Sequence, residues 1–242
     1  MTGDPIRRTK IVATLGPAWE EPGRIHALVD AGVNVVRVNS SHGTPELRSA
    51  WIERIKAVRR ERQAPLGILV DLHGPRIRVG KLGEPITLTQ GQEVAFAPEE
   101  TAEAGEIPTT YPELAEDVRP GSRILLDDGL LAVDVTRVHG DRVEGKVRYG
   151  GLLKANKGMN LPGADVSAPA MTESDREEVL RVCAIGIEHI GISFVRRAED
   201  VESVRRIAPK HVKLVAKIEK DTALDNLDDI LEAADALMVA RG

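Results

Sequence analysis

Short apolar runs alternate with amphipathic segments in two separate stretches of this chain, residues 9–79 and the part that follows residue 163. In the first stretch, the runs KIVATLG, NVVRVN and GILVDL are separated by PGRIHALVDAG and PELRSAWIERIKAVRRER. In the second, a capping sequence predicts a helix from about residue 172, and HIGISF, VKLVAKI and ALMVA are separated by two more helical segments. Such alternation predicts an α/β fold with parallel strands and crossover helices.

The sequence between residues 80 and 155 has a different pattern. The segments PITLTQGQEVAFAP, RILLDDGLLAVDVTRV and DRVEGKVRYGG are rich in β-branched residues and are interrupted by the turn sequences DDG and HGD. This pattern is typical of antiparallel hairpins, so we predict a small all-β domain inserted into the α/β fold. The predicted domains are therefore 1–79 and 156–242 for the α/β part and 80–155 for the insert.

The number of predicted parallel strands limits the architecture. A closed (β/α)8 barrel has eight parallel strands and typically about 250 residues without a large insertion. This chain of 242 residues provides six such strands outside the insert. We therefore expect an incomplete TIM barrel with about six of eight strands.

Composition excludes some classes of partner. The formal net charge of −5 provides no overall positive field that would attract nucleic acid or an anionic membrane. The single Cys183 cannot form an intrachain disulfide and fits a reducing cytosol. The sequence MTGDPIRRTK lacks the apolar core of a signal peptide, and no apolar run approaches the ~18 residues that a membrane span needs. We expect a cytoplasmic protein that binds neither nucleic acid nor membranes.

Polar side chains gather where the predicted parallel strands end. In a barrel, such residues at the carboxyl ends of strands are candidates for catalysis, whereas at a single strand a salt bridge that ties a loop explains them equally well. The polar strand ends are Arg37, Asn39, Ser41 and His42 on the second strand, Asp71, Arg76 and Arg78 on the third, Ser193 with Phe194 on the fourth, Lys217 and Glu219 on the fifth, and Arg241 with Gly242 on the sixth.

These residue types suit one another chemically. Arg37 and Arg78 suit a clamp for a phosphate or a carboxylate. Glu219 with a second oxygen donor suits magnesium, which takes one or two carboxylates together with substrate phosphates. Lys217 lies on the same strand face as Glu219 and suits the charge that develops on a transferred phosphoryl group or an enolate. The chain contains neither a GxxxxGK[ST] loop nor zinc-ligand spacing.

Eight segments carry a resemblance to a known family: RRTKIVATLGPA, GVNVVRVNSSHGT, DLHGPRIRVG, LDDGLL, NKGMNLPG, SFVR, KIEK and MVARG. They occur in the order found in pyruvate kinases, and the chain resembles that family over essentially its whole length. The resemblance implies a TIM barrel whose inserted β domain acts as a lid. It also implies the glycolytic transfer of a phosphoryl group from phosphoenolpyruvate to ADP, giving pyruvate and ATP, with magnesium or manganese as cofactor. A homo-oligomer is expected.

The resemblance further implies roles for individual residues. Arg37 would bind the transferring phosphate, Lys217 would lie between this phosphate and the enolate oxygen, and Glu219 would ligate the divalent metal. The remaining implied residues are Arg78, Ser193 and Gly242 for the substrate, His42, Lys157 and Asp128 for the nucleotide, and Asn39, Ser41, Asp71 and the Leu72 carbonyl for a monovalent cation such as potassium.

The chain departs from the family pattern at three places. Ser40 stands where the family usually has Phe, which removes an aromatic packing residue but no ligand. Arg76 stands where many potassium-dependent relatives carry Glu, and we hypothesise that its guanidinium replaces the monovalent cation. The family motif continues as ARGDLG, whereas this sequence stops at Gly242. A second metal carboxylate, the last two barrel strands and the allosteric domain are therefore missing from it, and we expect catalysis by these 242 residues alone to be lower by many orders of magnitude.

Four accounts of the chain follow. It is a shortened pyruvate kinase, or a short relative that completes its barrel with a partner chain. A third account is a non-catalytic protein that binds ADP or phosphoenolpyruvate or associates with other subunits. The fourth is a metal-dependent pyruvate aldolase, a class that shares a related barrel and a similar Glu and ARGD strand end. Such aldolases lack the hairpin insert that carries LDDGLL and NKGMNLPG.

Overall fold

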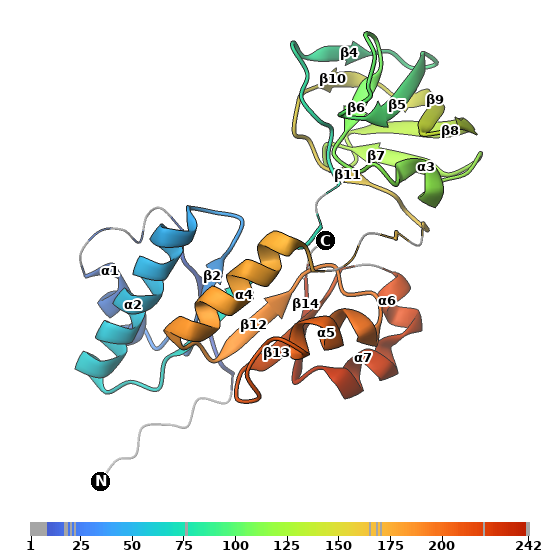
Figure 1. Ribbon diagram of the computed structural model, residues 1–242. Coiled ribbons are helices and arrows are strands. Elements are labelled where there is room, and N and C mark those ends of the chain that lie inside the picture. The colour runs from blue at the N-terminus through green and yellow to red at the C-terminus, as the bar shows by residue number, and fades with distance from the viewer. Residues whose placement is uncertain are drawn as a thin grey trace. The chain divides into compact units, whose positions relative to one another are not determined.

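The chain folds into two units, which are described separately below. The computed structural model describes residues 9–16, 19, 21, 23–75, 77–164, 166–167, 169, 171–219 and 221–240. Contacts between Cα atoms group Met1–Gly74 with Pro169–Gly242, here called the barrel unit, and separate Pro75–Ala168, here called the β unit. Figure 1 shows both units as ribbons.

The barrel unit consists of strands that alternate with helices. In chain order these are β1 (Val12–Thr14), α1 (Arg24–Asp30), β2 (Val35–Asn39), α2 (Pro45–Arg62), β3 (Gly67–Asp71), α4 (Glu173–Ile185), β12 (His189–Ile192), α5 (Ala198–Arg205), β13 (Lys213–Ile218), α6 (Thr222–Asp225), α7 (Leu227–Ala233) and β14 (Ala236–Val239). The six strands form one curled sheet in the order β1-β2-β3-β12-β13-β14, and every neighbouring pair is parallel (Figure 1). The predicted incomplete barrel with six parallel strands is confirmed.

The two faces of this sheet differ in chemistry. Because side chains in a strand alternate between faces, Val36 and Val38 of β2 point away from Arg37. Both valines are fully buried in a core that includes residues of helices α2, α4 and α5. Arg37 points to the opposite face, inside the curl of the sheet. The apolar face therefore anchors the helices and leaves the inner face for polar side chains.

Two helices of the barrel unit begin as the sequence predicts. Thr44 caps α2 by accepting a hydrogen bond from the Leu47 amide at 3.3 Å, and Pro45 occupies its first position. Thr172 caps α4 in a capping box with Asp175. Helix α4 thus begins where the capping sequence predicts, with Thr172 as its cap.

The β unit is built from short strands and one short helix. Its elements are β4 (Ile86–Leu88), β5 (Glu93–Pro98), β6 (Ile107–Thr109), α3 (Leu114–Asp117), β7 (Arg123–Leu126), β8 (Leu131–His139), β9 (Arg142–Tyr149), β10 (Gly151–Leu153) and β11 (Met159–Asn160). The main sheet has the order β11-β7-β8-β9-β5-β6, and β4 pairs with β10. A separate core surrounds the fully buried Phe96. The predicted hairpins in this region are present.

Backbone hydrogen bonds join the first and last segments of the β unit. The Val79 amide donates to the Lys157 carbonyl at 2.9 Å, and the Met159 amide donates to the Ile77 carbonyl at 2.9 Å. These bonds hold segments 77–79 and 157–159 within the β unit. The boundaries between the two units lie between residues 74 and 75 and between residues 168 and 169. The β unit is therefore longer than the range 80–155 that the sequence pattern suggests.

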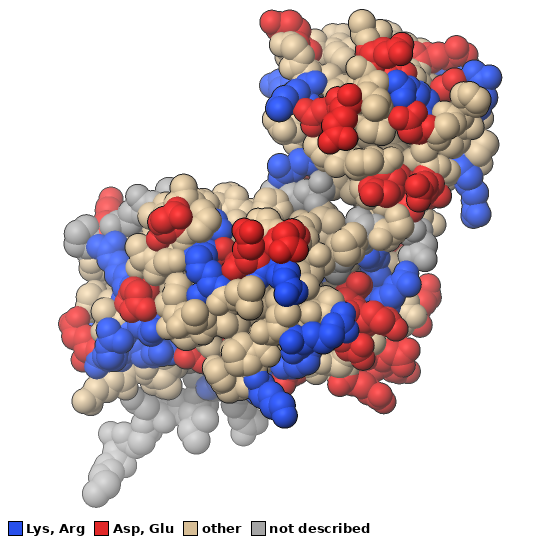
Figure 2. Space-filling view, in the orientation of Figure 1, with Lys and Arg blue, Asp and Glu red and all other residues tan. Residues whose placement is uncertain are grey.

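Both units expose acidic as well as basic side chains (Figure 2). In the view of Figure 2, acidic and basic side chains are interspersed over the described surface of the β unit, whereas acidic side chains gather over α6 and α7 of the barrel unit. No helix in the described part of the chain is long and apolar enough to cross a bilayer.

Cys183 is half-buried on α4 beside the apolar core, and burial raises the pKa of its thiol, as expected of a packing residue.

Candidate active site

Asp71, at the end of β3, is the centre of a polar cluster on the inner face of the barrel unit. Its carboxylate is 1% exposed and accepts hydrogen bonds from Arg37 on β2, at 2.8 Å from Nε and also from Nη2. The Lys217 ammonium on β13 lies 3.3 Å from the other carboxylate oxygen. Arg37 is held further by Thr14 of β1, whose hydroxyl accepts from Nη1 at 3.0 Å. Side chains from β2, β3 and β13 thus meet at one carboxylate, and β1 adds a contact to Arg37.

Lys217 connects this carboxylate to two more oxygens. Its Nζ donates to the Ser193 hydroxyl at 2.9 Å and lies 3.2 Å from Glu219 Oε1. The Lys217 side chain is only 9% exposed, so it depends on these oxygens rather than on water. The two cations Arg37 and Lys217 are balanced by the carboxylates of Asp71 and Glu219. The predicted convergence of these four residues is therefore present.

A turn with unusual backbone geometry holds Glu219. The Phe194 amide donates to Glu219 Oε2 at 2.8 Å, and Phe194 has φ of 56°, in the left-handed region that non-glycine residues seldom adopt. Gly74 lies against this turn with φ of 69°, and a Cβ there would come within 2.9 Å of the Phe194 ring. The turn therefore needs glycine at residue 74, and it orients the carboxylate that the sequence assigns to a metal.

The oxygens assigned to a monovalent cation lie beside the same cluster. Asp71 Oδ1 is buried and has no hydrogen bond among the described residues, although Lys217 forms an ion pair with it. Gly191 makes room for this oxygen, because a Cβ there would lie 3.0 Å from it. The Leu72 carbonyl accepts from Ser193 Oγ at 2.7 Å, and Asn39 Oδ1 accepts from the Ser41 amide at 3.0 Å. A buried anionic oxygen that lacks hydrogen bonds fits a cation, so the donor set is compatible with one.

The described residues supply few ligands for a divalent metal. They contain no group of three or more His, Cys, Asp or Glu side chains close enough to hold an ion. Glu219 provides one carboxylate that is oriented by a backbone N–H, which is how an outer-shell contact orients a metal ligand. This arrangement fits magnesium, which is bound by one or two carboxylates while phosphates and water complete its coordination.

The residues assigned to the nucleotide fall into both units. His42 is exposed on the loop between β2 and α2 of the barrel unit. In the β unit, Asp128 is exposed at the turn between β7 and β8, and Lys157 Nζ lies 2.7 Å from Asp127 Oδ1. Arg78 is half-buried in the β unit, where its amide donates to Thr110 Oγ1 at 3.1 Å. Arg76, Arg241 and Gly242 lie outside the described residues.

Three contacts of the candidate site residues are missed by reasoning from the sequence. Thr14 contacts Arg37 because β1 and β2 pair with these two residues in register, and the strand-end position of Thr14 is the only signal for it. The Phe194 amide contributes a backbone group, which no residue type can reveal. Asp127 rather than Asp128 pairs with Lys157, since two adjacent aspartates cannot be told apart by sequence alone.

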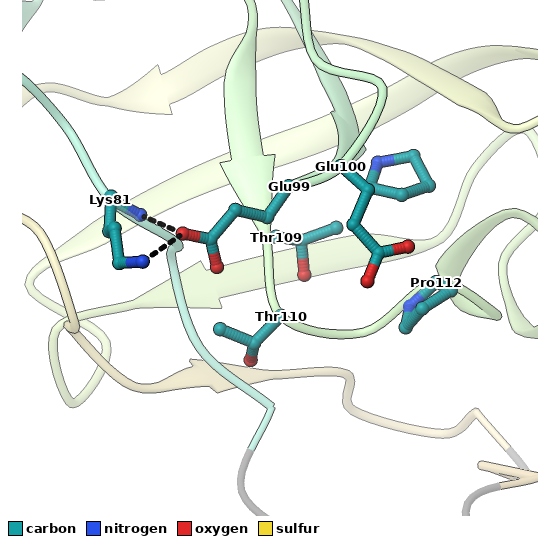
Figure 3. A pocket seen from close by; sticks show the side chains of 7 residues that line it. Lys81, Glu99, Glu100, Thr109, Thr110 and Pro112 are labelled. Carbon is teal, nitrogen blue, oxygen red and sulfur yellow. Dashed lines mark hydrogen bonds and ion pairs between the residues drawn. The ribbon is translucent and has the colours of Figure 1, made fainter.

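The β unit also contains a pocket of about 360 Å³, which Figure 3 shows from close by. Its charged side chains are Lys81, Glu99 and Glu100, and Lys81 Nζ lies 3.9 Å from Glu99 Oε1. Threonine and proline side chains complete the lining. The pocket includes none of the residues that the sequence assigns to substrate, nucleotide or metal, so it adds nothing to the candidate active site.

Comparisons with known proteins agree on one family. A family model described as the barrel domain of pyruvate kinase matches residues 6–242. The pyruvate kinase of Methylorubrum extorquens is 42% identical over 238 residues, covering 98% of this chain and 50% of that protein. The pyruvate kinase of Geobacillus stearothermophilus is 42% identical over 246 residues, covering 98% of this chain and 42% of that protein.

A solved structure shows the same fold. The crystal structure of a pyruvate kinase from Cryptosporidium parvum superposes with a TM-score of 0.92 at 31% sequence identity, covering 97% of this chain and 51% of that one. The chain thus spans about half the length, or less, of the relatives that it matches.

Proposed function

Because this chain belongs to the pyruvate kinase family, we propose that it carries the phosphoenolpyruvate-binding and phosphoryl-transfer residues of such an enzyme. The reaction is the transfer of a phosphoryl group from phosphoenolpyruvate to ADP. One observation carries the proposal: the Lys217 ammonium is buried among Asp71, Ser193 and Glu219, next to the guanidinium of Arg37. A buried cation that is already oriented stabilises developing negative charge without reorganisation.

Each member of the cluster has a separate part in this proposal. Arg37 binds the transferring phosphate, since a guanidinium offers a fork of N–H donors that matches phosphate oxygens. Lys217 stabilises the charge on the enolate oxygen when the phosphoryl group leaves. Ser193 donates to the Leu72 carbonyl and accepts from Lys217, which fixes the ammonium on the side of the substrate.

Glu219 would hold a divalent cation, magnesium or manganese. The bound cation would neutralise charge on the phosphoryl oxygens. The buried Asp71 oxygen, with Asn39, Ser41 and the Leu72 carbonyl, would hold a monovalent cation. The hypothesis that Arg76 replaces this cation remains a prediction, as do the homo-oligomer and the cytoplasmic location.

Each unit carries proposed nucleotide ligands: His42 in the barrel unit, and Lys157 and Asp128 in the β unit. The exposure of His42 supports this assignment, because its imidazole is accessible to a phosphate. Lys157 is paired with Asp127 and would exchange that carboxylate for a nucleotide phosphate. Arg78 and Gly242 complete the proposed substrate ligands.

The test uses two lysines of the same strand. Binding of phosphoenolpyruvate with magnesium is measured by isothermal titration calorimetry for the 242-residue chain, for Lys217→Met and for Lys213→Met. Lys213 pairs with Asp235 at the other end of β13 and serves as the matched control. We expect Lys217→Met to weaken binding at least 30-fold, about 2 kcal/mol, and Lys213→Met to change it less than twofold.

Two further measurements separate ligand binding from catalysis. Pyruvate formation is followed with lactate dehydrogenase, and the mass in solution is determined under the same conditions. Activity from a dimer would indicate a barrel completed by a partner chain, whereas binding without activity would indicate that the 242 residues bind but do not turn over. The proposal fails if the wild-type chain does not bind phosphoenolpyruvate or if Lys217→Met binds it unchanged.

A further inference from the structure

A buried ionic network lies beside the candidate active site but is not part of it. Arg48 in the first turn of α2 is 7% exposed, and Glu178 on α4 is 5% exposed. Arg48 Nε donates to Glu178 Oε1 at 2.9 Å and Nη2 donates to Oε2 at 2.8 Å. This two-point geometry matches the guanidinium to the carboxylate and fixes both side chains.

The remaining nitrogen of Arg48 holds the loop that carries His42. Arg48 Nη1 donates to the Gly43 carbonyl at 2.7 Å and to the His42 carbonyl at 3.3 Å. The other end of this loop is fixed by β3, because the Ser40 amide donates to the Asp71 carbonyl at 2.9 Å. The network contacts His42 through its backbone carbonyl, and the His42 residue is exposed.

Helix α4 supplies the rest of the network. Arg181 Nη2 donates to Glu178, and Arg181 Nη1 donates to the Pro45 carbonyl at 2.7 Å, where α2 begins. The Ser40 hydroxyl donates to Glu178 Oε1 at 3.4 Å. Burial raises the pKa of Glu178, but hydrogen bonds from Arg48 and Arg181 outweigh this effect and keep the pKa below its ordinary value. Glu178 is therefore a charged anchor that joins α4 to both ends of loop 40–44.

We propose that Arg48 and Glu178 are positioning residues that hold loop 40–44, and with it the imidazole of His42, in the geometry that binds the nucleotide phosphates. The inference rests on the proposed function for its ligand. The central guanidinium binds two carbonyls of the loop directly, so loss of the network would release the backbone that carries His42. The polar Ser40 belongs to the same arrangement, since it adds a donor to Glu178 where the family usually has an aromatic side chain.

The experiment compares this network with a second ion pair of α2. Arg59, near the other end of the helix, pairs with Glu188 at 2.6 Å, and Glu188 also accepts from the Ile68 amide at 2.9 Å. Glu178→Gln removes a buried carboxylate charge that pairs with α2, and Glu188→Gln removes a half-buried one. Hydrogen exchange of two backbone amides is followed by NMR in the 242-residue chain: His42, which donates to the Asn39 carbonyl at 3.1 Å, and Ile68.

Opposite results are expected for the two variants. Glu178→Gln should speed exchange of the His42 amide at least tenfold and leave the Ile68 amide within twofold, and Glu188→Gln should do the reverse. A merely structural contribution would speed both amides alike in both variants. Equal acceleration of both amides, or an unchanged His42 amide in Glu178→Gln, would overturn the proposal.

Ligand binding provides the second readout. The dissociation constant of magnesium ADP should rise at least tenfold in Glu178→Gln and in Arg48→Met, while that of phosphoenolpyruvate changes less than threefold, because Arg37 is held by Asp71 and Thr14. Arg48→Lys, which keeps the charge without the fork, should recover part of the loss. If both ligands weaken equally, the positioning role is refuted. If the wild-type chain binds neither ligand, the proposed function fails and the exchange measurement still decides the inference.

Discussion

Replacing Asp71 by Asn tests how much the polar cluster depends on its central charge. The variant keeps the shape of the side chain but leaves the cations of Arg37 and Lys217 with Glu219 as their one remaining carboxylate in the cluster. Removing one partner of a buried ion pair typically lowers the free energy of unfolding by about 3–5 kcal/mol. The Arg37 side chain is 24% exposed, so water compensates part of its loss. We expect a decrease of about 3 kcal/mol, a large part of the ~5–15 kcal/mol that stabilises a typical domain.

The aromatic residues of the chain allow each unit to be followed separately during urea unfolding. Both tryptophans, Trp19 and Trp51, belong to the barrel unit, and both tyrosines, Tyr111 and Tyr149, belong to the β unit. Tryptophan fluorescence should therefore report the loss caused by Asp71→Asn, while the tyrosine signal of the β unit keeps its midpoint.

A matched control lies in the β unit. Asp127→Asn removes the partner of Lys157, but these side chains are 19% and 37% exposed, so the unfolding free energy should change by less than about 1 kcal/mol. The reasoning is refuted if Asp71→Asn changes the tryptophan transition by less than about 1 kcal/mol, no more than an exposed ion pair contributes. It is also refuted if both transitions shift by the same amount.

Three further predictions concern other parts of the barrel unit. Gly74→Ala should displace the Phe194 turn and weaken magnesium-dependent phosphoenolpyruvate binding at least tenfold in calorimetry, whereas Gly16→Ala, with open space around it, should not. Burial raises the pKa of Asp235, but the hydrogen bonds that Asp235 accepts outweigh burial and lower this pKa. The contribution of Asp235 to stability is therefore complete above about pH 5 and is lost as the pH falls below about 4. Asp235→Asn should lose this pH dependence of stability in urea unfolding measured from pH 6 to pH 3. Ser40→Phe should lower the thermal midpoint by several degrees, because the ring must displace a buried carboxylate, and Ser40→Ala should leave it nearly unchanged.

Much of the barrel unit can be predicted because its sequence patterns are local. Alternating apolar runs identify the strands, and a strand of five residues such as β2 places Arg37 on the face opposite Val36 without knowledge of its neighbours. The parallel connections then bring the carboxyl ends of all strands to one edge of the sheet. For these reasons the meeting of Arg37, Asp71, Lys217 and Glu219 follows from the sequence.

The rest depends on contacts between distant parts of the chain. Arg48 and Glu178 are 130 residues apart, and each alone is indistinguishable from a solvated charge on a helix. Phe194 contributes its amide through a left-handed backbone conformation, which its side chain does not favour. The boundaries of the β unit also depend on pairing between segments 77–79 and 157–159, which no local pattern predicts.

The hydrogen bonds that join these two segments have a consequence for engineering the molecule. Because residues 77–79 and 157–159 already lie side by side, segment 77–160, which contains every strand of the β unit, can be cut out of the chain with its ends adjacent. A short peptide linker across these ends would permit a circular permutant that opens at an exposed turn such as Gly140. Such a permutant would retain every strand pairing of the unit, so it offers a route to the isolated β unit as a free-standing reagent.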